Sequence, residues 1–148
     1  MAKKYLIVDD DDLFRDLLYT FFCDDADVLT AKNGQEALAL VKAHCFDIIL
    51  TDYNMPVMNG IEFLEQAREI NSDTYLHSIL LTGSIDKEVK SFGERNGITL
   101  ILKPFSVFEL EKTVNMLLEE SAGNHPNYPR DVPVPGNGDC HSLPTEMM

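Results

Sequence analysis

The apolar run Tyr5-Leu6-Ile7-Val8 leads directly into four aspartates, Asp9-Asp10-Asp11-Asp12. An apolar run without polar alternation is typical of a strand that is covered on both faces, as in a parallel sheet. Similar runs recur further along the chain, at residues 48–50, 79–81 and 98–102, with a weaker one at 27–31. These segments predict the five strands of one sheet.

The segments between the strands carry apolar residues at three- and four-residue spacing, which is the pattern of amphipathic helices. Polar pairs mark several helix ends: Asn33-Gly34 and Asn59-Gly60 open the second and third helices, and Asn96-Gly97 closes the fourth. Ser106, with Glu109 three residues later, predicts the start of the fifth. Alternating strands and helices indicate an α/β fold with a parallel sheet.

The length of 148 residues and the formal net charge of −13 narrow the class of protein. The length predicts one compact domain. The acidic excess argues against direct binding to nucleic acid or insertion at anionic membranes, because both need clustered Lys and Arg. No apolar stretch approaches the roughly 18 residues of a membrane span, and the first run is shorter than a secretory signal. We therefore expect a cytoplasmic protein.

The composition changes abruptly near the C-terminus. Five of the seven prolines follow residue 121, together with several glycines. A segment this short and this rich in Pro and Gly cannot bury enough apolar surface to fold. We expect a folded domain at 1–121 and a disordered tail at 122–148.

Acidic residues follow two of the predicted strands. Asp9 and Asp10 follow the first strand, and Asp52 closely follows the third. In open parallel sheets, ligands bind at the carboxyl ends of strands where the winding direction reverses. If these strands are neighbours, the three carboxylates lie close together and repel one another unless a cation intervenes. Oxygen ligands of this kind predict a Mg²⁺ site.

Complementary groups follow the next two core strands. Thr82 offers a hydroxyl after the fourth run, and Lys103 offers an ammonium after the fifth. A metal ion and Lys103 would neutralise the charge of a transferring phosphoryl group, the Thr82 hydroxyl would bond one of its oxygens, and a carboxylate would be the nucleophile. The set predicts a phosphoryl-transfer site.

These motifs, in this order and at these spacings, resemble the receiver domain of response regulators in two-component phosphorelays. The resemblance runs from about Lys4 to Glu120, and its motifs are Val8-Asp9-Asp10, Asp52-Tyr53-Asn54-Met55-Pro56-Val57-Met58-Asn59-Gly60, Leu81-Thr82-Gly83-Ser84 and Lys103-Pro104-Phe105. It implies a flavodoxin-like, doubly wound sheet in the strand order 2-1-3-4-5 with five helices. It also implies a cis bond between Lys103 and Pro104, which X–Pro bonds tolerate at low cost.

The resemblance also implies roles for individual residues. Asp52 would be the phosphoacceptor. Asp9 and Asp10 would hold Mg²⁺ together with Asp52 and the backbone carbonyl of Asn54. Thr82 would be the switch hydroxyl and Lys103 the basic partner of the phosphoryl group.

Two positions depart from the common receiver pattern. Leu100 stands where many receivers carry an aromatic residue, and Gly83 follows the switch threonine. We expect unchanged phosphorylation chemistry but a muted or differently built switch. Tyr53, directly after the acceptor, is expected to flank the site and to slow the approach of water.

The leading hypothesis is a signalling receiver, not a metabolic enzyme, that takes phosphate from a histidine kinase or histidine phosphotransfer protein and then changes its contacts with a downstream protein. It would catalyse its own phosphorylation and a slow dephosphorylation. One alternative is a phosphatase of the haloacid dehalogenase type that uses Asp9 and Asp11, although Leu13 does not fit that group's pattern. The other is a degenerate receiver that serves only as a binding module.

Overall fold

The computed structural model describes residues 3–120, and in it five parallel strands form one sheet in the order β2-β1-β3-β4-β5. The strands are β1 (Lys3–Val8), β2 (Ala26–Ala31), β3 (Ile48–Asp52), β4 (Ser78–Thr82) and β5 (Thr99–Leu102). The predicted strand order is confirmed, and β1 and β3 are neighbours at the centre of the sheet.

The helices begin where the sequence offers a side chain that can cap them. They are α1 (Asp12–Phe22), α2 (Gly34–Ala43), α3 (Gly60–Ile70), α4 (Lys87–Asn96) and α5 (Val107–Glu119), with a short 3₁₀ helix, η1 (Thr74–His77), before β4. Asn33 caps α2, Asn59 forms a capping box with Glu62, and Ser106 caps α5. Each cap satisfies a backbone N–H that the first turn of a helix leaves unpaired.

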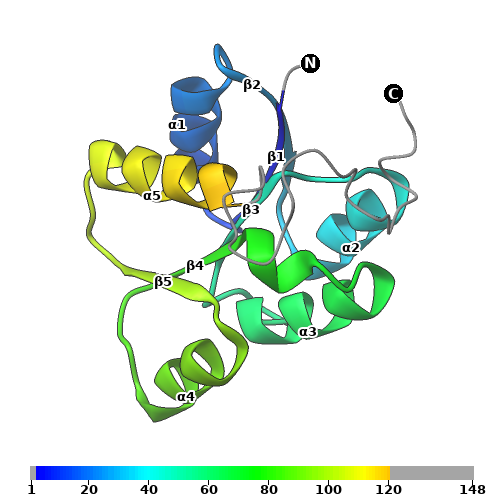
Figure 1. Cartoon of the computed structure of the whole chain (residues 1–148), viewed down its shortest axis with the longest axis vertical. Coiled ribbons are helices and arrows are strands. Elements are labelled where there is room, and N and C mark those ends of the chain that lie inside the picture. Colours follow the sequence, from blue (N-terminus) through cyan, green and yellow to red (C-terminus); the bar gives the residue numbers. More distant parts are fainter. Residues whose placement is uncertain (1–2, 121–148) are drawn as a thin grey trace.

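The helices cover both faces of the sheet (Figure 1). Leu6 and Val8 point into a core that lies under α2, α3 and α4. Tyr5 and Ile7, on the opposite face of the same strand, point into the core under α1 and α5. Because side chains alternate along a strand, the continuous apolar runs serve two cores at once.

This architecture leaves the carboxyl edge of the sheet open, where the loops after β1, β3, β4 and β5 meet. The helices within residues 3–120 include none that is long and apolar enough to cross a bilayer. The predicted tail at 122–148 lies outside the described residues, so its disorder stays a prediction.

Candidate functional site

The end of β1 holds Asp9 at the edge of the sheet. Its backbone N–H donates to the carbonyl of Ala31 at 3.1 Å, which continues the pairing of β1 with β2 by one residue. Its side chain is 2% exposed, and Oδ1 accepts a hydrogen bond from the Asp11 N–H at 2.9 Å. Asp11 itself turns away and caps α1, accepting from Leu13 and Phe14. Asp9 is therefore a site residue and Asp11 a helix cap.

Asp52 is the last residue of β3 and is buried, with 5% of its surface exposed. The chain then turns sharply into α3. The Tyr53 carbonyl accepts from the Gly60 N–H at 2.8 Å, and a Cβ on Gly60 would clash with the carbonyl oxygen of Asp52. Only glycine permits this approach, so Gly60 sets the packing of α3 directly behind β3.

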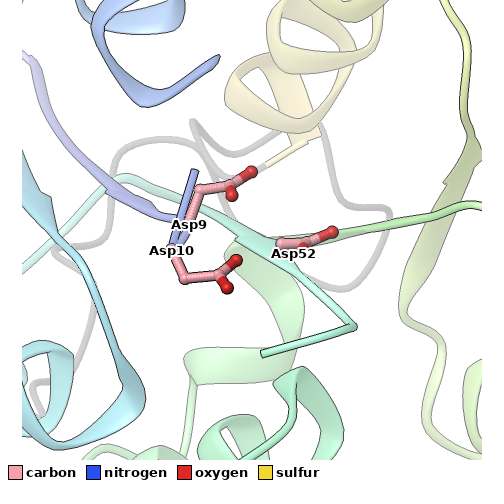
Figure 2. Close-up of side chains that lie close together, drawn as sticks. All are labelled: Asp9, Asp10 and Asp52. Carbon is pink, nitrogen blue, oxygen red and sulfur yellow. The ribbon is translucent and has the colours of Figure 1, made fainter. Parts of the chain in front are cut away.

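Asp9, Asp10 and Asp52 form an acidic cluster. One carboxylate oxygen from each lies within 4.8 Å of the others, and the three side chains project into the same space (Figure 2). Burial raises the pKa of Asp9 to about 6, with repulsion from Asp52 adding to the effect, and burial also raises the pKa of Asp52. Asp9 Oδ2 is buried without a hydrogen-bond partner among the described residues. A hard cation would satisfy this oxygen and reduce the repulsion.

Lys103, directly after β5, reaches into this cluster. Its Nζ lies 2.7 Å from Asp52 Oδ1 and 3.9 Å from Asp9 Oδ2. The Lys103 N–H donates to the Thr82 carbonyl at 2.7 Å, and the bond to Pro104 is cis, as the resemblance implied. The hydrogen bond from Lys103 and the attraction of its charge both lower the pKa of Asp52 and partly offset the effect of burial.

Thr82 ends β4 and is buried, but its hydroxyl does not contact the acidic cluster. Oγ1 donates to the carbonyl of Ser84 at 2.7 Å, within its own loop. Leu100 is half-buried and packs against α4, where a Cβ on Gly93 would lie 3.0 Å from its Cδ1. The Thr82 hydroxyl is thus hydrogen-bonded within its own loop, to the backbone of Ser84.

The two residues after Asp52 differ in their surroundings. Tyr53 directly follows Asp52, and its hydroxyl donates to Glu88 of α4 at 3.2 Å. Asn54 lies exposed two residues after Asp52. Its carbonyl as a metal ligand, and the slowing of water by Tyr53, stay predictions.

Two residues of α1 belong to the site although the sequence did not single them out. Arg15 donates through Nη1 to the Asp9 carbonyl at 2.7 Å and through Nη2 to Asp12, which ties the loop after β1 to the helix. The Phe14 ring lies under the Lys103 ammonium, with Nζ 4.9 Å from the ring centroid. The signal available was an aromatic and a basic residue in the first turns after the aspartates, but helix periodicity assigns Phe14 to the core.

Comparisons with known proteins agree with this geometry. Residues 5–115 match the family described as the response regulator receiver domain. A response regulator receiver protein of Anaeromyxobacter is 37% identical over 107 residues, which cover 71% of this chain and 44% of that protein. The alkaline phosphatase synthesis transcriptional regulatory protein PhoP of Bacillus subtilis is 34% identical over 124 residues, covering 82% and 50%.

Solved structures give the same result. The chemotaxis protein CheY4 of Vibrio cholerae is 36% identical with a TM-score of 0.72, covering 80% of this chain and 100% of that one. The chain spans about half the length of the two curated relatives, 44% and 50%. The likeness to them therefore concerns the domain and not the whole of each relative.

Proposed function

The chain belongs to the response regulator receiver family, and on that premise we propose that it accepts a phosphoryl group on the carboxylate of Asp52 in a Mg²⁺-dependent reaction. As a receiver domain it is a signalling module and not a metabolic enzyme. The observation that carries the proposal is the buried Asp52 carboxylate, 2.7 Å from the Lys103 ammonium and beside two further aspartates.

The proposed step transfers the phosphoryl group from a histidine of a kinase or phosphotransfer protein. An oxygen of Asp52 forms the new bond to phosphorus. The bond from phosphorus to the imidazole nitrogen breaks, its electron pair leaves with the imidazole, and that ring takes up a proton from solvent. Lys103 keeps its proton and supplies positive charge to the phosphoryl oxygens. The Thr82 hydroxyl, at the end of the strand that pairs with β3, would turn and donate to one of them.

The donor set suits Mg²⁺. Asp9 and Asp10 supply carboxylate oxygens near Asp52, the unpartnered Asp9 Oδ2 lacks a positive neighbour closer than 3.9 Å among the described residues, and the Asn54 carbonyl is the proposed fourth protein ligand. Mg²⁺ is a small, hard ion that prefers oxygen ligands. It usually retains several of its water ligands and is bound by only a few protein carboxylates. When bound, it would add positive charge beside the phosphoryl oxygens.

Incubation with acetyl phosphate tests the proposal. With Mg²⁺, intact-mass measurement is expected to find one added phosphoryl group on the parent and none on Asp52→Ala; without Mg²⁺ the parent is expected to gain none. Equal labelling of the parent and Asp52→Ala would overturn the assignment. A parent that folds, takes no label and still binds a partner protein would favour the binding-module alternative.

The phosphatase alternative has lost its main support. It requires the Asp11 carboxylate as an acid or base, whereas that carboxylate accepts from the Leu13 N–H at 3.0 Å and caps α1. A cytoplasmic location, a downstream protein target and slow loss of phosphate from Asp52 belong to the receiver proposal. A panel of kinases, read for the fastest transfer, would identify the donor.

A further inference from the structure

We propose that Phe14 is the positioning residue for Lys103: its aromatic ring holds the ammonium in place against Asp52 by a cation–π contact. The inference rests on the proposed role of Lys103 in phosphoryl transfer. Lys103 Nζ lies 4.9 Å from the centre of the Phe14 ring and 2.7 Å from Asp52 Oδ1, so the ammonium lies between a ring and a carboxylate.

The ring itself is held firmly. Phe14 lies in the first turn of α1, and its backbone N–H donates to the Asp11 side chain at 3.2 Å. The ring also meets Phe105 edge to face, with 5.8 Å between ring centres. A ring fixed by a capped helix and a second ring is a rigid platform, and aromatic pairs prefer this edge-to-face arrangement.

The lysine needs such a platform because its surroundings leave it room. Its side chain is 31% exposed, and a pocket of about 400 Å³ opens beside it, lined by Phe14, Lys103, Pro104 and Phe105. A four-carbon stem whose ammonium pairs closely with Asp52 and lies 3.9 Å from a second carboxylate, that of Asp9, can otherwise sample several rotamers and swing into this pocket. The face of an aromatic ring attracts a cation, so Phe14 favours the rotamer that points at Asp52.

The contact also explains why the position carries an aromatic ring. An aliphatic residue in the first turn of α1 would fill the same space against Phe105. It would give the ammonium no electrostatic attraction, because the ring quadrupole provides that and packing does not. The contact that Phe14 makes at the site is with Lys103, so we infer that its effect acts through Lys103.

A series of ring variants at position 14 separates electrostatics from packing. Phe14→Leu removes the ring, Phe14→Tyr keeps it, and fluorinated phenylalanines weaken the quadrupole at nearly constant shape. Phe21→Leu is the matched control: Phe21 is also half-buried on α1, but its ring meets Phe22 at 5.0 Å and Phe108 at 6.3 Å. The readout is the rate of Asp52 phosphorylation by phosphoramidate at saturating Mg²⁺ and donor.

We expect Phe14→Leu to lower that rate about three- to tenfold, the range that a partly exposed cation–π contact supplies. The rate should fall steadily with each added fluorine, while Phe14→Tyr and Phe21→Leu should stay close to the parent. A flat fluorine series in a phosphorylated parent would overturn the inference, since packing alone predicts no electronic trend. Because the fluorinated rings preserve volume, poor folding of Phe14→Leu does not prevent this test.

A second measurement needs no phosphoryl donor. The ring current of Phe14 is expected to shift the ε-methylene protons of Lys103 upfield in the NMR spectrum of the parent and of Phe21→Leu, and the shift should vanish in Phe14→Leu. An unshifted parent resonance would overturn the inference by itself. If the parent instead shows the ring shift but never takes phosphate, the proposed function fails and the Phe14–Lys103 contact stands.

Discussion

Lys103 lies directly after β5 and Thr82 at the end of the neighbouring strand β4, yet the two residues relate differently to the acidic cluster. On the acidic side, Lys103 already lies 2.7 Å from Asp52. On the α4 side, the Thr82 hydroxyl donates to Ser84 in its own loop, 2.7 Å away. Buried carboxylates attract an ammonium strongly and a neutral hydroxyl weakly. Charge therefore holds Lys103 against Asp52 without a phosphoryl group, and we call this pair the acidic side. The Thr82 hydroxyl, which we call the α4 side, has no such attraction to the acidic cluster.

Removing the lysine charge should produce the largest effect. Lys103→Met is expected to slow phosphorylation of Asp52 by about 100-fold, the cost of losing one preorganised group that stabilises developing charge. Lys112→Met, on an exposed position of α5, is the matched control and should match the parent. The measurement is the rate of labelling by acetyl phosphate with Mg²⁺. A decrease in the labelling rate of less than about threefold would contradict the claim that the Lys103 charge is central to the reaction at Asp52.

Removing one buried carboxylate should stabilise the protein when Mg²⁺ is absent. The folded-state pKa of Asp9, about 6, exceeds the ordinary value of 3.8, so the folded state binds more protons between these values. Stability therefore falls as the pH rises from about 4 to about 6 and stays low above it. Asp9→Asn, which carries no such charge, is expected to gain about 2 kcal/mol in unfolding free energy at pH 7.

Urea denaturation at several pH values, with and without Mg²⁺, measures this gain. Mg²⁺ should stabilise the parent and leave Asp9→Asn nearly unchanged, because a ligand that binds only the folded state stabilises it. Asp16→Asn, an exposed acid on α1, serves as the control and should keep the response of the parent. Equal stability of Asp9→Asn and the parent at pH 7 without Mg²⁺ would contradict the claim that the buried Asp9 carboxylate destabilises the folded state.

Removing the hydroxyl on the α4 side should have a smaller effect than removing Lys103. Thr82→Val is expected to slow phosphorylation about fivefold, since a neutral hydrogen bond contributes about 1 kcal/mol. Thr82→Ser keeps the hydroxyl and should restore most of the rate. A loss for Thr82→Val as large as that for Lys103→Met would mean that the hydroxyl is as essential as the charge, and the contrast between the two sides would fail.

The packing of Leu100 on α4 should give the smallest effect. An Ala in place of Gly normally stabilises a helix by about 1 kcal/mol. At Gly93 the added methyl group would meet Leu100 Cδ1 at 3.0 Å. Gly93→Ala is therefore expected to raise the unfolding free energy little in the parent, and to raise it by the full amount when Leu100 is also replaced by Ala. A double-mutant cycle of unfolding free energies measures this coupling. Gly83→Ala, where a Cβ meets no atom within 4 Å, is the uncoupled control.

Much of the fold was predictable because its signals are local. Continuous apolar runs indicated strands that are buried on both faces. Asn33, Asn59 and Ser106 cap the helices whose starts they were expected to mark. The end of β3 differs slightly: the strand includes Thr51 and Asp52, because backbone pairing with β4 continues past the apolar residues. The strand order was predicted from the family resemblance, because the pattern of apolar residues along a strand does not indicate which strand lies beside it.

The sequence also singled out the residues of the candidate site, but not the contacts that each of them makes. The sequence determined by itself that the carboxyl ends of the strands of one parallel sheet carry Asp9, Asp10, Asp52, Thr82 and Lys103, because apolar periodicity and strand ends are properties of consecutive residues. Only the tertiary structure decided that Lys103 rests on Phe14, that Thr82 turns to Ser84, and that burial raises the pKa of Asp9 to about 6. These depend on rotamers, burial and distances between residues far apart in the chain, which no local pattern encodes.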